Sequence, residues 1–287
     1  MDARYQPPWP LGLILQPATL SLYAGIHRLL LRLHWLAHTA QRSRERVRAA
    51  AKGCRRGHAR QQKLSPLHEG ALRGAHALLH RLAYLASLLL QHVALQTDGE
   101  PWAALRGLLD EASSSSLSMG AAGEGQGQQG QQGAMTVDGL RAAHAAYIAE
   151  VAARCFVPPS PLSTATGSGD ENEDGGGTHR AHREMEGLVA FVAAACQALE
   201  DAMLPTLLSP SPDAPALLRA LALRVSQVRA RLRVRVARLA EEVCALRLRE
   251  GLWSGGGGVG GGMGRRDSGY ADSLVRGLED VLEAGRC

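Results

Sequence analysis

One stretch of the chain repeats its apolar residues with a helical period so regular that it constrains the whole fold. Between residues 221 and 246 these residues follow in alternating four- and three-residue steps: Leu221, Val225, Val228, Leu232, Val236, Leu239, Val243 and Leu246. Such steps return to one face of an α-helix, whereas on a strand they would alternate between faces. The stretch therefore predicts a long amphipathic helix that begins near Pro215 and ends at Trp253, before a glycine tract.

The same period recurs in four further parts of the sequence, residues 20–33, 72–93, 140–155 and 188–199. Aromatic residues make up only 4% of the 287 residues, so a core must be built from leucine, alanine and valine. That composition favours helices, because strands are enriched in β-branched and aromatic residues. We expect an all-α fold, an irregular helical bundle large enough to bury a sizeable core.

Two low-complexity segments interrupt this pattern. Residues 113–133 are rich in serine, glycine and glutamine, and residues 158–177 contain an acidic run. Both compositions are typical of disordered insertions, since they offer little apolar surface to bury. We expect one helical domain over residues 1–253, a glycine-rich linker at 254–267, and a short helix or tail at 268–287.

Composition also indicates where such a chain works. Its five cysteines are scattered and form no CxxC pair, which favours a reduced, cytosolic compartment. The most apolar stretch, residues 77–95, is interrupted by His80, Arg81, Gln91 and His92. A membrane span needs about 20 largely uninterrupted apolar residues. We therefore interpret this stretch as a buried helix and expect no membrane span.

No arrangement of residues predicts chemistry. Two histidine pairs have the i, i+4 spacing of helical zinc ligands, His34 with His38 and His76 with His80, but neither has a third ligand nearby. The acidic run resembles the opening of a calcium-binding loop, yet the position of its bidentate glutamate is Ala181. The glycine tract lacks the strand and the Gly-Lys-Ser/Thr ending of a phosphate-binding loop. We expect no catalytic residue, no metal and no cofactor, and hence no enzyme.

The N-terminal segment carries the clearest resemblance to a known family. It contains a tight corner, Trp9-Pro10-Leu11, followed by a helix that Pro17 opens and that carries Tyr23 on its apolar face. This order and spacing resemble the start of a helical segment in the C-terminal half of the gamma-tubulin complex components. We expect Trp9 to be largely buried against the helix that follows.

A second segment, residues 140–156 with His144 and Tyr147, is similar to the family's segment of a hydrophobic residue, a histidine and an aromatic–aliphatic pair. Residues 72–93 resemble the long helix between the two segments, and residues 246–248 resemble the family's closing leucine-rich turn. The compact spacing around the corner is most similar to the smallest, fourth-type component. Compared with the family the chain lacks an N-terminal half, so we expect an N-terminally truncated member.

The resemblance implies a function. Gamma-tubulin complex components hold gamma-tubulin, assemble with one another and template microtubules. A member would act in microtubule nucleation in the cytoplasm, as part of the cytoskeleton at microtubule-organising centres or spindle poles. Its partners would be gamma-tubulin and other components of the complex.

Basic surfaces leave the kind of partner open. The first helical stretch ends near His38 and passes into a basic run from Arg42 to Lys63, which contains no aromatic residue, so base stacking and nucleic-acid recognition are not expected. The run is a solvated face, an anionic-surface contact, or a surface that speeds encounter with an acidic tubulin. A further face of the last long helix serves either solvent or a partner: Arg224, Arg231, Arg235 and Arg238. The alternative function is therefore a basic helical module that binds anionic polymers or membrane surfaces.

Overall fold

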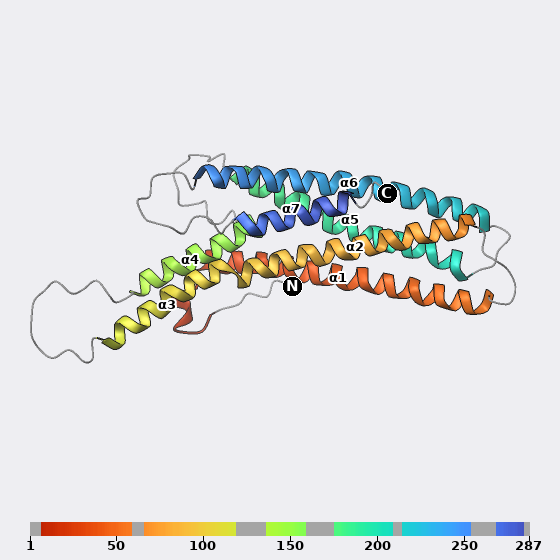
Figure 1. The fold of residues 1–287 in the computed structure, drawn as a ribbon. Helices are drawn as coiled ribbons and strands as arrows, with labels where there is room; N and C mark the ends of the chain where they lie inside the picture. Colours follow the sequence, from red (N-terminus) through yellow and green to blue (C-terminus); the bar gives the residue numbers. More distant parts are fainter. Residues whose placement is uncertain are drawn as a thin grey trace, which may run out of the picture. The chain divides into compact units, whose positions relative to one another are not determined.

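The computed structural model describes residues 7–58, 66–118, 136–158, 175–208, 214–253 and 268–283. Within these ranges all regular structure is helical and there is no strand, which confirms the all-α bundle. The elements are a 3-10 turn η1 (Leu11–Leu13) and the helices α1 (Pro17–His58), α2 (Pro66–Asp98), α3 (Glu100–Ser118), α4 (Val137–Arg154), α5 (Gly175–Leu208), α6 (Ala214–Trp253) and α7 (Ser268–Glu283) (Figure 1).

Several helices run further than their apolar stretches predicted. α1 does not end near His38 but continues to His58, through most of the basic run. Arginine and alanine are good helix formers, and Ala40 and Val47 extend the buried face, so nothing in this segment stops the helix. α3 extends to Ser118 and α5 begins at Gly175, so both expected insertions are shorter than predicted. The remainder of each insertion, and the predicted linker, lie outside the described residues.

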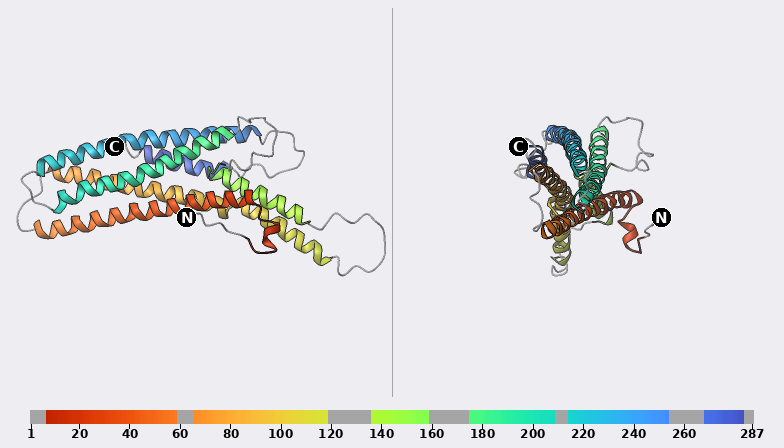
Figure 2. Two further views of the ribbon diagram at one scale, coloured as in Figure 1. Left: turned by 180° about the vertical axis from the view of Figure 1, so that it is seen from behind. Right: turned by 90° about the vertical axis from the view of Figure 1, so that its right-hand side faces the viewer.

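The chain divides into two compact units. The first comprises residues 1–29 and 93–175, and the second comprises residues 30–92 and 176–287. The boundaries fall inside α1 and α2, so each of these helices contributes to both units. Figure 2 shows the long helices of the second unit running side by side: the C-terminal part of α1, most of α2, and α5 and α6.

The core of the second unit is built from leucine and methionine on α1, α2 and α5, and α6 adds Leu221 and Leu239. The largest fully buried side chains are Leu33, Leu36, Leu78, Leu79, Leu82, Leu85, Leu89, Met185, Leu188, Leu199 and Met203. One carboxylate lies among them: Glu200 on α5 is only 3% exposed. Ser43 Oγ donates to its Oε2 at 2.6 Å, and Arg46 forms an ion pair with its Oε1. The basic run is thus attached to α5 through two residues of α1.

In the first unit, the backbone that follows α4 caps this helix and contacts α1. Phe156 follows the helix with φ 58°, in the left-handed region where glycine is usual. Its N–H donates to Ala153 O at 3.0 Å, and the N–H of Val157 donates to Ala152 O at 2.7 Å, which is the Schellman pattern. Phe156 is 5% exposed, so burial of its ring offsets the backbone strain. Val157 in turn lies against α1 at Gly25, where an added Cβ would be 2.7 Å from Val157 Cγ1.

Two helical stretches, residues 69–111 and 177–207, are long and apolar enough to cross a membrane by length and composition alone. In each, about half of the most apolar window is buried inside the protein, 50% and 44% respectively. Core helices of a helical bundle have this property as well. We interpret both stretches as core helices.

Candidate partner-binding surfaces

Three residues that carry the family resemblance, Tyr23, His144 and Tyr147, come together in the first unit. Tyr23 Oη lies 2.9 Å from His144 Nε2, and the two rings stack with centroids 5.7 Å apart. Tyr147 Oη donates to Thr97 O at 3.2 Å. The rings of Tyr147 and Trp102 pack edge to face, with their centroids 6.0 Å apart. This aromatic cluster therefore joins α1 to α4, and α4 to α2 and α3.

Burial sets the protonation of the cluster. It raises the pKa of Tyr23 and lowers the pKa of His144. It also raises the pKa of Tyr147, with smaller contributions from Tyr23, Asp98 and Cys155. Both groups are therefore neutral at physiological pH, and the tautomer of His144 sets which of the two donates the hydrogen bond. His144 Nδ1 is buried and has no hydrogen-bond partner in the described part of the chain, which suits a structural role better than proton transfer.

The Trp9-Pro10-Leu11 corner is not the core anchor that the sequence predicted. Trp9 is 85% exposed, so the expectation of a buried indole is wrong. The segment is attached through its backbone instead, because Arg141 Nε of α4 donates to Leu13 O at 2.9 Å. Leu11 and Leu13 are also exposed, and η1 contains no buried residue. Exposed apolar side chains that gather in one place are typical of interaction sites, so the corner becomes a candidate contact.

In the second unit, the four arginines predicted on one face of α6 are not equivalent. Arg224, Arg231 and Arg238 are exposed. Arg235 is half-buried, with its guanidinium carbon 5.5 Å from the centroid of the Phe191 ring on α5. An added Cβ at Gly187 would lie 2.8 Å from Arg235 Nη1. Arg235 therefore packs on α5, and three arginines remain accessible to a partner.

Two apolar residues lie between these arginines. Leu223 is 59% exposed and Val234 is 53% exposed. At 100° per residue they share the outer half of α6 with Arg224, Arg231 and Arg238, and we call these five residues the α6 strip. Sequence reasoning missed the two apolar members because they lie off the buried stripe. Their signal was apolar character at positions where the helical period predicts polar residues.

The described residues bear on two kinds of reactive site, a metal centre and a reactive thiol. No group of three or more histidine, cysteine, aspartate or glutamate side chains there could hold a metal ion. The two histidine pairs gain no third ligand in the part of the chain that the structure describes, and His80 Nδ1 lies 3.1 Å from Arg44 Nη1. Cys155 and Cys196 are buried, and burial raises the pKa of each thiol to about 12. Both thiols therefore stay protonated and make poor nucleophiles.

The described residues thus form an all-helical frame with buried, protonated thiols and mixed basic and apolar outer surfaces. Comparison with protein families makes the assignment specific: the family described as gamma tubulin complex component C-terminal matches residues 3–250. The chain belongs to this family, whose members are structural scaffolds. Neither the curated proteins nor the solved structures gave a match to this chain.

Proposed function

We propose that this chain binds gamma-tubulin as a component of the gamma-tubulin complex and acts in microtubule nucleation and organisation. The observation that carries the proposal is the family match, which spans residues 3–250 and includes the aromatic cluster, the corner and the α6 strip. On this proposal the chain is a scaffold and not an enzyme. Its other partners are further components of the complex, and it works in the cytoplasm at microtubule-organising centres or spindle poles.

The α6 strip is the surface that we propose for the contact. Arginine is enriched in protein interfaces, and an exposed leucine and valine beside it supply apolar area that a partner can bury. The strip also suits an acidic partner, because opposite charge raises the association rate. Between Arg219 and Arg238 the helix carries seven arginines and no acidic residue.

The test is equilibrium binding of purified gamma-tubulin to the immobilised full chain, with α/β-tubulin, DNA and anionic vesicles as competitors. We expect binding that unlabelled gamma-tubulin displaces and that the other three displace poorly. If DNA or vesicles compete as well as gamma-tubulin itself, the chain is the alternative, a basic helical module for anionic polymers or membranes. The exposed Arg42 and Arg48 and the formal net charge of +5 are the observations that keep this alternative in view.

Finer assignments belong to the same proposal. We propose one domain at residues 1–253, a linker at 254–267 and a terminal segment at 268–287. We also propose that, among the components, this chain is most similar to the fourth type.

A further inference from the structure

Helix α7 occupies a groove between α2 and α6. Its buried residues follow at four- and three-residue steps: Leu274 is 1% exposed, Leu278 is 0% exposed and Val281 is 6% exposed. Gly277 on the same face permits close approach to α2, because an added Cβ would lie 2.7 Å from both methyl carbons of Leu88. The groove therefore fits a helix with this one narrow apolar stripe and a small residue within it.

The two helices that form the groove lie within the family match, whereas α7 lies outside it. The family match ends at residue 250, so it includes α2 and nearly all of α6 but none of α7. Fourteen residues join Trp253 to Ser268, and eight of them are glycine. A helix of 16 residues is marginal on its own in water, so α7 depends on the groove for its stability. The groove belongs to the family domain, and α7 is joined to it as an additional helix.

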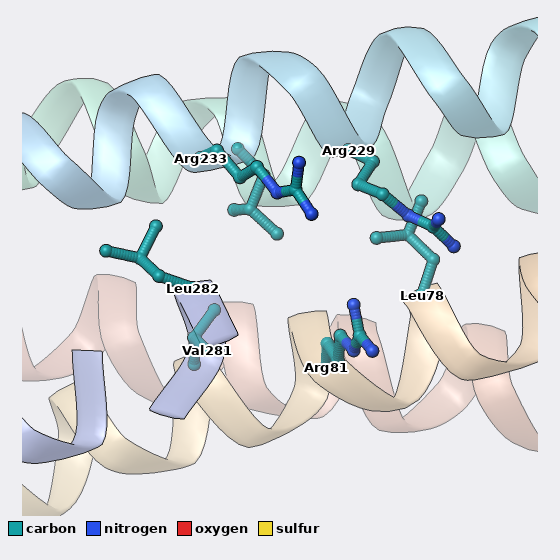
Figure 3. Close-up of a pocket in the computed structure, with 7 residues that line it drawn as sticks. Leu78, Arg81, Arg229, Arg233, Val281 and Leu282 are labelled. Atoms are coloured by element: carbon teal, nitrogen blue, oxygen red, sulfur yellow. The ribbon is translucent and has the colours of Figure 1, made fainter. Parts of the chain in front are cut away.

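Three arginines surround the end of the groove where α7 stops. Arg81 from α2 and Arg229 and Arg233 from α6 line one small cavity of about 10 Å³, together with Val281 and Leu282 of α7. Figure 3 shows the three guanidinium groups entering the same gap.

This arrangement selects the charge of a bound helix. The C-terminus of a helix carries a partial negative charge, which the three guanidiniums complement. The charged residues described on α7, Arg276, Glu279, Asp280 and Glu283, are all exposed. The negative charge that meets the three guanidiniums is therefore that of the helix terminus itself. Arg229 Nε is buried and has no hydrogen-bond partner in the described part of the chain. A helix with an acidic C-terminal end fits this groove better than a basic one.

From these contacts we propose that the groove between α2 and α6 is a docking site for an acidic amphipathic helix of a partner protein, and that α7 is its tethered competitor. The partner helix carries apolar residues at i, i+4 and i+7 and acidic residues near its C-terminus. Because α7 is attached to the same chain, it competes at a high effective concentration. The site is thus closed by default and opens when α7 leaves. This inference does not depend on gamma-tubulin binding.

The test uses a fluorescent peptide of residues 268–283 as the probe and the full chain as the receptor. Leu278→Glu places a charge in the groove and releases α7, whereas Ser273→Glu places the same charge on an exposed position of the same helix. We expect the peptide to bind the Leu278→Glu chain more tightly than wild type or Ser273→Glu, by a factor on the order of 10²-fold, because the tethered competitor is gone.

The role of the arginines at the end of the groove is tested in the chain that carries Leu278→Glu. Adding Arg229→Glu with Arg233→Glu should weaken peptide binding at least about tenfold, and most at low salt. Arg42→Glu with Arg48→Glu, at two exposed positions of α1, makes the same charge change and should leave the affinity unaltered. Equal losses from the two pairs would show that the end of the groove does not select charge, and that part of the proposal would fail.

A last measurement needs no substitution and covers the case in which Leu278→Glu fails to fold. Excess peptide added to the wild-type chain should accelerate hydrogen exchange of the α7 amides, because the peptide displaces α7 in part. If exchange of α7 is unchanged by peptide at millimolar concentration, α7 is a fixed part of the fold and the docking site does not exist. The same conclusion follows if the opened chain melts cooperatively yet binds the peptide no better than wild type.

Discussion

At the scale of single residues, the structure assigns the family-motif side chains to two different tasks. Tyr23, His144 and Tyr147 form a half-buried cluster that joins helices distant in sequence. Trp9 does not take part in a core and is 85% exposed. Residue identity and spacing predicted that these positions matter, but the direction of each side chain depends on tertiary packing. The Tyr23–His144 contact joins residues 121 positions apart, which no local pattern specifies.

The exposed indole gives a first prediction. Trp9→Ala should change the free energy of unfolding by no more than about 0.5 kcal/mol, because surface substitutions away from a core cost little. Leu82→Ala, at a fully buried position, should cost about 2–5 kcal/mol. Thermal and denaturant unfolding of both variants tests this contrast. An equal loss of unfolding free energy in the two variants would show that Trp9 is part of the core.

The aromatic cluster gives a prediction about pH. Burial lowers the pKa of His144 in the folded chain, so the folded state favours the neutral imidazole. The resulting stability is present above the ordinary histidine pKa of about 6.5 and is lost as the pH falls through the lower folded value. His144→Gln cannot titrate and should lack this share of the loss. Melting temperatures of both chains from pH 8 to pH 5 measure it, and parallel curves would exclude the effect.

At the scale of elements, the close approach of α1 to the end of α4 is testable by a single methyl group. Gly25→Ala places a Cβ 2.7 Å from Val157 Cγ1 and should cost about 1–3 kcal/mol through overpacking. Gly107→Ala on α3 meets nothing within 4 Å and should be neutral or stabilising by up to about 1 kcal/mol. Combining Gly25→Ala with Val157→Ala should cost less than the sum of the two single changes. Additive losses in this double-mutant cycle would show that Gly25 and Val157 are not in contact.

The attachment of α1 to α5 gives a second prediction at this scale. Arg46→Ala leaves the Glu200 carboxylate buried with Ser43 as its remaining described partner. Removing one member of a buried ion pair costs about 3–5 kcal/mol, and the exposure of Arg46 places this case at or below the lower end of that range. Arg42→Ala, an exposed position of the same run, should change stability by less than about 0.5 kcal/mol. Urea unfolding of the two variants compares them directly, and equal effects would contradict the role of Glu200.

The elements themselves were largely predictable from sequence. The five predicted stretches fall in α1, α2, α4, α5 and α6, because burial of one helix face imposes the 3.6-residue period on the sequence. Helix ends were less predictable, since alanine, arginine and serine continue a helix without adding to an apolar stripe. α3 shows this clearly: Ser113 Oγ and Ser114 Oγ bond back to Leu109 O and Glu111 O within the helix.

At the scale of the whole molecule, two short motifs in the sequence were enough to predict the family, but they did not predict the binding surface. The sequence placed four arginines on one face of α6, yet it gave no sign that Arg235 packs on Phe191. Nor did it reveal that Leu223 and Val234 are exposed beside the remaining three. Such facts depend on which neighbouring helix covers each side of α6. The α6 strip is therefore a proposal that combines sequence pattern with packing.

The most direct test of the central claim is the association rate constant of gamma-tubulin with the immobilised full chain, measured against ionic strength. Replacing the three strip arginines, Arg224, Arg231 and Arg238, by glutamate should lower this rate constant at least about tenfold at low salt and less at high salt. The matched control replaces Arg28, Arg42 and Arg48, three exposed residues of α1, by glutamate, and its rate constant should fall only slightly. If the control slows association as much as the strip variant, or if wild type does not associate with gamma-tubulin at all, the account is contradicted.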